Sequence, residues 1–350
     1  MTLPATGPIS LGAIRTELGA SGPISLGSAA VRTLLGAASG TITMNAGHGK
    51  SNGLVTGTTG YSIGGQMGGL ATNEFVGLVF ASESVVDPIV GLIAARQLVA
   101  GVNSSTRGYA MGGRDDYGTS YNTIDGIRFD TEAAITTGAY LNIERYGITG
   151  ANSSTVGYGM YGQGYNDFSG SAVWPMGVDG MVLATETNYG VGVFLSGGYY
   201  AASGFNSTAR AYVMGSFSMD GPVNKTVALQ FNTDTGYDLS ATMATARYLT
   251  SGVNSTTRGY NLGGYTGSFA TAEIDGLRFD TEASINPSAG LTSARFGVVG
   301  VNSNTRAYAL GGNGSNEIDG LQFDTETAIN PSAALPVAQS SGAGVQAGQG

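Results

Sequence analysis

The sequence contains no cysteine and one histidine, and charged residues make up only 11% of its 350 residues. Without cysteine the chain forms neither disulfide bonds nor a thiolate metal site. The single histidine, His48, lies in a glycine-rich stretch. We interpret it as a linker residue, because one isolated histidine supplies neither a metal cage nor a Ser-His-Asp triad. We therefore expect no metal, no cofactor and no catalytic residues.

Positive charge and long apolar runs are also scarce. The 15 Lys and Arg residues against 24 Asp and Glu give a net charge of −9, which disfavours a nucleic-acid partner, whose phosphates require clustered cations. Glu83, Asp87 and Pro88 interrupt the most apolar stretch, residues 75–100, so we expect no membrane insertion. The first residues, MTLPATG, lack the basic region and apolar core of a signal peptide.

Glycine, in contrast, is abundant, and the chain is repetitive. Its 59 glycines show no three-residue period, which favours turn-rich β structure over collagen. A strand-like motif occurs six times, with successive tyrosines 48 to 54 residues apart, which is the period range of propeller blades. The copies are TGYSIGG (Tyr61), RGYAMGG (Tyr109), VGYGMYG (Tyr158), RAYVMGS (Tyr212), RGYNLGG (Tyr260) and RAYALGG (Tyr308).

The tyrosine motif alternates in size. The tyrosine and the apolar residue two positions later share one strand face, while Gly or Ala precedes each tyrosine on the other face. Stacked sheets need such large groups to enter the space left by small ones. The Gly pair that ends most copies permits a bulge or a close backbone approach.

Two further elements recur around each tyrosine motif. An Arg and an Asn-Ser-Ser/Thr turn precede it, as in ARQLVAGVNSST, and a strand ending in Phe-Asp-Thr-Glu follows it, as in IDGIRFDTEA (124–133). We expect a fourth, weaker strand in segments such as GAYLNIE and AGLTSA. Four strands repeated six times predict an all-β fold, a six-bladed β-propeller over residues 53–350.

The carboxyl-terminal residues predict how this ring closes. ALPVAQSSGAGVQAG (334–348) aligns with GLTSARFGVVGVNSN (290–304), which places Gln339 at the Arg position and Gln346 at the Asn position. Blade one lacks a good innermost strand of its own, since GHGKSNGLV is rich in Gly and polar residues. An open ring would leave unpaired strand edges. We therefore expect residues near Gln339–Gln346 to pair with the Tyr61 strand.

These repeats resemble kelch propellers, in which a glycine pair follows an aromatic-containing second strand and a turn-forming Asp follows the third. The resemblance covers about residues 53–350 and implies a kelch-like propeller. Some propellers of this architecture are copper oxidases, but the Cys and His ligands that they need are missing from this sequence.

Residues 1–52 carry a different repeat, PISLGAIRTELG followed by PISLGSAAVRTLLG and a decayed third copy. Each full copy predicts a short β segment and then a short helix ending at Gly19 or Gly36. The stretch resembles the amino-terminal segment of many tailed-bacteriophage virion proteins. The matching residues are Ile9, Ser10, Leu11, Ile14, Leu18 and Gly19, then Ile24, Ser25, Leu26, Val31, Leu35 and Gly36. The resemblance implies a small α+β attachment segment that docks on other virion proteins.

Three sets of residues are candidates for function. The Phe-Asp-Thr-Glu carboxylates suit either a turn or a calcium site, and their repetition favours the turn (Asp130, Glu132, Asp280, Glu282, Asp324 and Glu326). The blade-entry arginines are interpreted as structural partners of buried carbonyls or carboxylates (Arg96, Arg145, Arg247 and Arg295). The divergent loops between second and third strands carry the third set, Tyr117, Tyr121, Tyr165, Phe168, Trp174, Phe217, Tyr265 and Phe269.

These loop aromatics have two open interpretations: they stack on sugars or anchor a protein partner, or they fold back over blade edges. We expect any receptor contact on this loop face and not in the central channel. Together with the resemblances, this predicts a non-enzymatic virion structural protein, a tail or tail-fibre component that is multimeric in the particle and contacts a host-surface glycan or protein. A head or neck decoration protein and, from another class, a glycan-active enzyme are the alternatives.

Overall fold

The computed structural model describes residues 59–88, 90–166, 171–173, 177–196 and 200–346. The expected attachment segment, the boundary near residue 52 and His48 lie outside these residues. Strands account for the regular structure of the described part, which contains no helix long and apolar enough to cross a membrane. One compact unit, Gly57–Arg128 with Glu132–Gly350, holds all of these strands.

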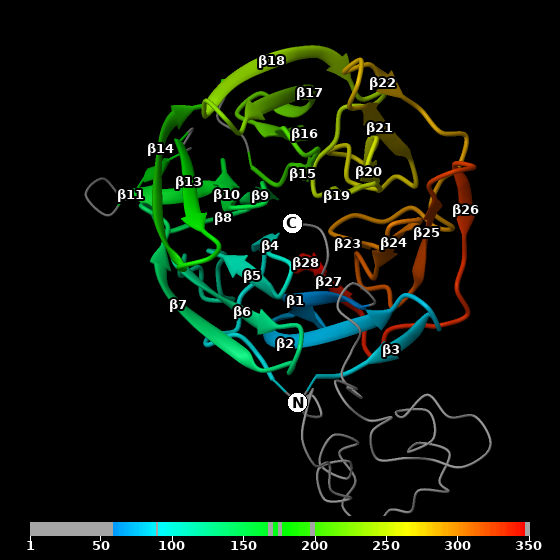
Figure 1. The fold of residues 1–350 in the computed structure, drawn as a ribbon. Coiled ribbons are helices and arrows are strands. Elements are labelled where there is room, and N and C mark those ends of the chain that lie inside the picture. The colour runs from blue at the N-terminus through cyan, green and yellow to red at the C-terminus, as the bar shows by residue number, and fades with distance from the viewer. Residues whose placement is uncertain (1–58, 89, 167–170, 174–176, 197–199, 347–350) are drawn as a thin grey trace, which may run out of the picture. The chain divides into compact units, whose positions relative to one another are not determined.

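This unit is a six-bladed β-propeller, and each blade is an antiparallel sheet of four main strands (Figure 1). The tyrosine motif forms the second strand from the centre in every blade, as the repeat predicts. From the innermost to the outermost strand, the blades are: blade one, β28 (Ala343–Gln346), β1 (Thr59–Met67), β2 (Leu70–Val79) and β3 (Ser84–Val86); blade two, β4 (Ala100–Asn103), β5 (Arg107–Met111), β6 (Thr123–Arg128) and β7 (Ala134–Tyr140); blade three, β9 (Thr149–Asn152), β10 (Val156–Met160), β13 (Gly177–Val182) and β14 (Thr187–Phe194); blade four, β15 (Ser203–Asn206), β16 (Arg210–Ser218), β17 (Gly221–Gln230) and β18 (Thr235–Thr242); blade five, β19 (Ser251–Asn254), β20 (Arg258–Leu262), β21 (Ile274–Arg278) and β22 (Ser284–Ile285); blade six, β23 (Val299–Asn302), β24 (Arg306–Leu310), β25 (Ile318–Gln322) and β26 (Thr327–Ile329).

Four short strands lie outside this scheme. In blade one, β27 (Gln339–Ser340) pairs with the far end of β1. Three others, β8 (Arg145–Tyr146), β11 (Gln163–Asn166) and β12 (Ser171–Val173), form a small separate sheet at the long loop of blade three. The long insertion between the second and third strands of this blade therefore has secondary structure of its own.

The expected position of the fourth strands is wrong. The outermost strands follow the Phe-Asp-Thr-Glu turn directly, as in β22 (Ser284–Ile285), and GAYLNIE only overlaps the end of β7, while AGLTSA forms no strand. Alternate residues of these outer strands are exposed, so they carry too little apolar pattern to stand out. The apolar residues of the later segments, Leu141 and Leu291, are instead buried in the apolar core clusters.

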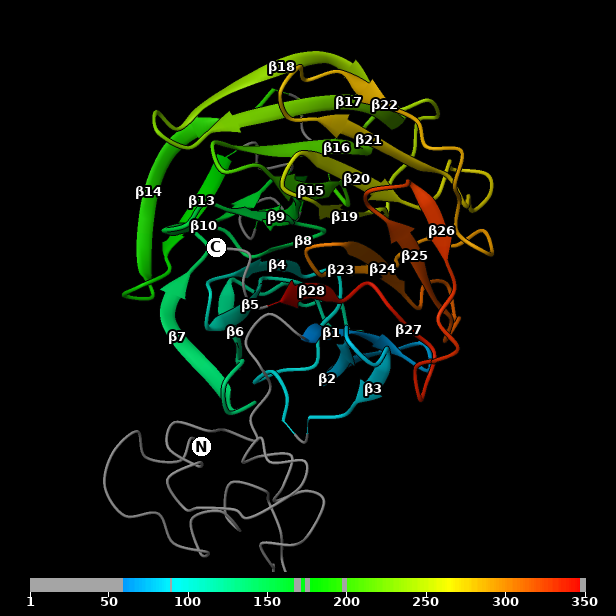
Figure 2. The same cartoon turned by 45° about the vertical axis from the view of Figure 1, so that its right-hand side comes forward.

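The ring closes with strands from both ends of the propeller sequence. In blade one, β28 pairs antiparallel with β1 in the register Gly60 with Gln346 through Ile63 with Ala343. Figures 1 and 2 show the dark-red β28 beside the blue β1. The predicted alignment also holds in detail, because Gln339 donates from Nε2 to the carbonyl of Gly64. In blades five and six, Arg247 and Arg295 donate to the equivalent carbonyls of Gly263 and Gly311. The expected pairing near Gln339–Gln346 is confirmed.

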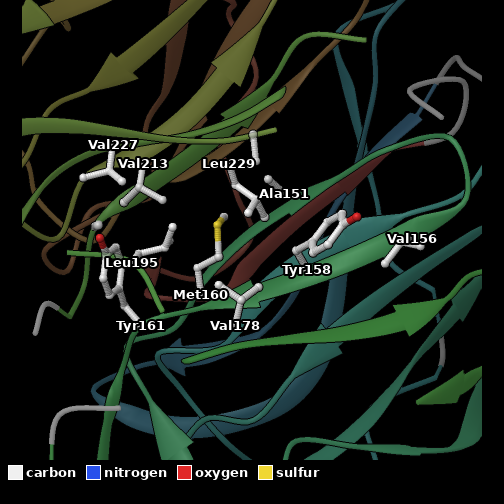
Figure 3. Close-up of a cluster of buried hydrophobic side chains, with 12 residues drawn as sticks. Ala151, Val156, Tyr158, Met160, Tyr161, Val178, Leu195, Val213, Val227 and Leu229 are labelled. Carbon is white, nitrogen blue, oxygen red and sulfur yellow. The ribbon is translucent and has the colours of Figure 1, made fainter. Parts of the chain in front are cut away.

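The apolar core lies between neighbouring blades. One cluster joins blades three and four, with Tyr158 and Met160 facing Val213 and Leu229 (Figure 3). The small residue before each tyrosine makes this packing possible: a Cβ on Gly259 would lie 2.0 Å from the Phe205 ring of the preceding blade. The alternation of large and small residues in the sequence is thus the means by which the blades interlock.

Candidate functional site

The six repeated tyrosines join each blade to the next. Each hydroxyl donates to the turn carboxylate of the following blade, over oxygen-to-oxygen distances of 2.8 to 3.3 Å. The pairs are Tyr61 with Glu132, Tyr109 with Glu186, Tyr158 with Asp234, Tyr212 with Glu282, Tyr260 with Glu326 and Tyr308 with Glu83. The six bonds form a closed circle, which gives these carboxylates a structural role.

The backbone and neighbours of these carboxylates fit the same role. All six acceptor residues have positive φ, between 49° and 54°, so a tight left-handed turn aims each carboxylate at the preceding blade. In four of the contacts the arginine two positions before the tyrosine also donates to the carboxylate, as Arg306 does to Glu83 at 2.7 Å. The sequence pointed to the Asp of Asp-Thr-Glu, whereas the following Glu makes the inter-blade contact.

The four blade-entry arginines lie inside the blades, as predicted. Arg145 donates to the Gly159 carbonyl at 3.1 Å and to Asp179 at 2.6 Å, and Arg96, Arg247 and Arg295 repeat the arrangement with the equivalent Asp residues. Burial lowers the pKa of Arg145, and Asp179 opposes this effect. In blade one both partners are replaced, by Gln339 and Val76.

The backbones of the innermost strands approach one another closely around the axis. Each innermost strand carries a glycine, and a Cβ on Gly344 would lie only 1.9 Å from the carbonyl oxygen of Gly300. The residue two positions before each innermost strand has positive φ, and its amide donates to the carbonyl of its counterpart in the preceding blade, at 2.7 or 2.8 Å. These residues are Leu98, Gly147, Ala201, Leu249, Gly297 and Ser341. They surround a hollow of about 110 Å³ on the axis.

This hollow opens on the loop face, the end of the propeller that carries the loops between second and third strands. The antiparallel strand order places those loops at the same end as the segments that enter the innermost strands. Isolated bridges between the two sets of segments confirm the placement, for example Tyr248 with Tyr265 and Tyr200 with Phe217. We call this opening the mouth.

Six aromatic side chains, which we call the aromatic arc, lie on the loop face beside the mouth, over blades three to six. Ring centroids follow one another at 4.8 to 6.4 Å, mostly in edge-on or tilted contacts, which are favourable aromatic geometries. The arc consists of Tyr146, Tyr200, Phe217, Tyr248, Tyr265 and Phe296. All but Tyr146 are partly exposed.

Burial raises the pKa of two tyrosines of the arc, which favours their neutral hydroxyl form. Burial, together with the hydroxyls of Tyr248 and Tyr146, raises the pKa of Tyr200, while Arg114 acts in the opposite direction. Burial also raises the pKa of Tyr248, with a further contribution from Tyr265. Tyr146 donates its hydroxyl proton to Gln163 at 2.7 Å. The arc therefore offers ring faces together with neutral hydroxyl groups.

Comparison with known proteins adds no family to this geometry. No protein-family model and no curated protein matches this chain.

The loop aromatics that the sequence analysis named lie in different places in the structure. Phe217 and Tyr265 belong to the aromatic arc. Tyr121 lies beneath the guanidinium of Arg96, whose Cζ is 6.0 Å from the ring centroid, and Tyr117 and Phe269 are 96% and 64% exposed at loop tips. Phe168, Trp174 and the side chain of Tyr165 lie outside the described residues.

Sequence reasoning missed Tyr146, Tyr200, Tyr248 and Phe296, the inner members of the arc. Three of them directly follow a blade-entry arginine, in ERY, ARY and ARF. The sequence shows this regularity. In an extended segment, however, the residue after the buried arginine points to the opposite side, and the sequence does not tell what lies there. Only the arrangement of the blades shows that this position lies beside the mouth, with a side chain that is partly exposed in blades four to six and buried in blade three.

The acidic groups near the mouth are held by backbone amides. Asp115 accepts from the amides of Tyr117 and Thr119 at 2.9 and 2.8 Å, and Asp116 accepts from the amide of Ala71 at 2.9 Å. Although slight burial opposes the change, these amides lower the pKa of Asp115. Among the described residues, no group of three His, Cys, Asp or Glu residues could hold a metal ion.

Proposed function

We propose that this chain is a non-enzymatic structural protein of a tailed-bacteriophage virion, a tail or tail-fibre component whose propeller presents its loop face to the host surface. The aromatic arc around the mouth carries the proposal. Partly exposed tyrosine and phenylalanine rings at the centre of a face are typical of surfaces that bind sugars or anchor a protein partner.

The construction of the propeller supports this role. The circle of tyrosine contacts and the circle of backbone hydrogen bonds fix all six blades, while the loops that reach the mouth differ from blade to blade. A rigid scaffold with variable loops is the usual arrangement of binding proteins. The Ile-Ser-Leu units of residues 1–52 support the virion part of the proposal through their resemblance to phage attachment segments.

The binding role is tested by replacing Tyr200 and Tyr248 with alanine in the full chain. We expect the double variant to lose binding of the labelled protein to host cells by about tenfold or more, because each ring supplies stacking or burial worth roughly 1 kcal/mol. Phe194→Ala, on the exposed outer strand of blade three, is the matched control. Binding equal to that of the control, in a variant with unchanged thermal unfolding, would refute a binding role for the arc.

The virion role has its own test. Antibodies against the propeller should label the tail of purified particles in electron micrographs, and deletion of residues 1–50 should abolish incorporation while the propeller keeps its unfolding temperature. Normal incorporation of the truncated chain contradicts the attachment segment. Labelling confined to the head contradicts the tail assignment.

A further inference from the structure

The mouth is divided into an aromatic and a polar sector. The position that directly precedes each left-handed residue of the central circle is aromatic in blades three to six, with Tyr146, Tyr200, Tyr248 and Phe296. In blades one and two the same position is polar, with Ser340 and Gln97. Gln97 is 8% exposed and donates from Nε2 to Asp116, whereas Ser340 is partly exposed and donates to Gln66. The partly exposed rings of blades four to six are therefore the larger surface that a ligand meets at the mouth.

A single cation marks the border between the two sectors. The Cζ atom of Arg114 lies 4.3 Å from the ring centroid of Tyr146, where it makes a cation–π contact at the first member of the arc. Its backbone is fixed by two hydrogen bonds with Gln97, of 2.9 and 3.0 Å. The effect of Arg114 on Tyr200 shows that its positive charge reaches the next ring as well.

Arg114 also differs from the eight arginines that pair with carboxylates within or between the blades. Arg107, Arg210, Arg258 and Arg306 each pair with a turn carboxylate, and the four blade-entry arginines pair with buried Asp residues. Within the part of the chain that the structure describes, the half-buried guanidinium of Arg114 has no carboxylate partner. The neighbouring carboxylates, Asp115 and Asp116, are directed to backbone amides instead. Arg114 thus brings a positive charge without a carboxylate partner in the described part of the chain to the end of the aromatic arc.

We propose that the mouth binds an anionic carbohydrate, a pyranose that carries a carboxylate. The apolar face of the sugar stacks on the partly exposed rings of the aromatic arc, its hydroxyls reach the tyrosine hydroxyls, and its carboxylate pairs with Arg114. An arginine matches a carboxylate through two parallel N–H donors, which gives both affinity and orientation. This inference rests on the proposed binding role of the loop face and specifies the chemical class of its ligand.

The experiment measures binding of the full chain to matched charged and neutral sugars by titration calorimetry. The probes are an oligogalacturonate, the same oligomer with its carboxylates methyl-esterified, and sialyllactose with lactose as its neutral counterpart. We expect the charged member of at least one pair to bind about tenfold or more tightly, the range that a charge-assisted hydrogen bond supplies. The preference should weaken as salt is raised. The pair that shows it identifies the sugar as a uronate or a sialate.

Variants separate this inference from the binding role itself. Arg114→Gln should reduce the charged-to-neutral preference to about twofold or less while neutral binding persists, and Arg114→Lys should restore part of the preference. Arg278→Gln, an exposed arginine near the opposite end of blade five, is the control and should leave the preference unchanged. Equal binding of charged and neutral sugars that depends on Tyr200 and Tyr248 overturns the anionic ligand and leaves the binding role intact. Binding of none of the probes overturns the carbohydrate assignment as well.

Discussion

Closure of the propeller by β28 makes Gly344 the most sensitive point of the ring. In a Gly344→Ala variant the new Cβ would lie 1.9 Å from the Gly300 oxygen and 2.9 Å from its carbonyl carbon, both of them backbone atoms. Relief needs a shift of about 1 Å between β28 and β23, because ordinary carbon-to-oxygen contacts are more than 3 Å. β28 is paired with β1 and is packed between β23 of blade six and β4 of blade two, so a shift away from Gly300 moves it toward Gly101 and disturbs its pairing with β1.

The cost follows from what that movement breaks. The four residue pairs that join β28 to β1 contain about four backbone hydrogen bonds, each worth about 1 kcal/mol. Val345, which is completely buried, loses part of a packing contribution of about 2 kcal/mol. We expect Gly344→Ala to lower the free energy of unfolding by about 4 kcal/mol, which corresponds to roughly 8 °C in melting temperature for a domain of this size.

The measurement is thermal and urea unfolding followed by circular dichroism. Gly138→Ala is the matched control, because Gly138 is exposed on β7, its φ is not positive and a Cβ there meets nothing within 4 Å. Deletion of residues 338–350 should destabilise at least as much as Gly344→Ala. Melting of Gly344→Ala within about 1 °C of Gly138→Ala, or a harmless deletion, would refute the closure argument.

Two further predictions concern the buried groups of the blades. Asp125→Val alone leaves the Arg96 guanidinium buried without its carboxylate and should lower the free energy of unfolding by about 3 to 5 kcal/mol. Adding Arg96→Gln, which copies the pair found in blade one, should recover at least half of that loss in urea titrations, and a double variant no more stable than the single one contradicts the coupling. Burial raises the pKa of Tyr260 and Tyr308 to about 12, so their stabilisation is complete below pH 10 and is lost as the pH rises from 10 to 12. Each should contribute up to about 2 to 3 kcal/mol of that loss, and an unfolding free energy that stays constant between pH 9 and 12, or a Tyr308→Phe variant with an unchanged pH profile, would show that these tyrosines do not control alkaline stability.

Sequence reasoning succeeded where a repeat carries a strong local pattern. The alternation around each tyrosine, the glycine pairs and the turn residues gave the six blades, and the alignment of Gln339 with the arginines gave the closing strand. These features depend on residues close together in the sequence, through the alternation of side chains along a strand and the residue preferences of turns. The outer strands were misplaced because their alternate residues are exposed and carry a weak pattern.

The site was harder to predict because it is made by the ring and not by any one repeat. Tyr146, Tyr200 and Tyr248 look like ordinary strand residues until the blades are arranged around an axis. The same holds for the glycine of each innermost strand, whose need for a hydrogen side chain comes from the backbone of the neighbouring blade. Contacts between blades join residues about 50 positions apart or more, and single-blade patterns do not contain them.

The pairing of β1 with β28 also determines the order in which the protein folds. Gln339 and Gly64 are separated by 275 residues, so the inner edge of β1 has no partner strand until nearly the whole propeller has been synthesised. At ribosomal rates of roughly 5 to 20 residues per second, this edge stays open for tens of seconds. An unpaired strand with buried-type side chains such as Tyr61 and Ile63 accepts a matching strand from any neighbouring chain. Crowded nascent copies are therefore at risk of exchanging their last strands, and domain-swapped chains are the expected misfolded product.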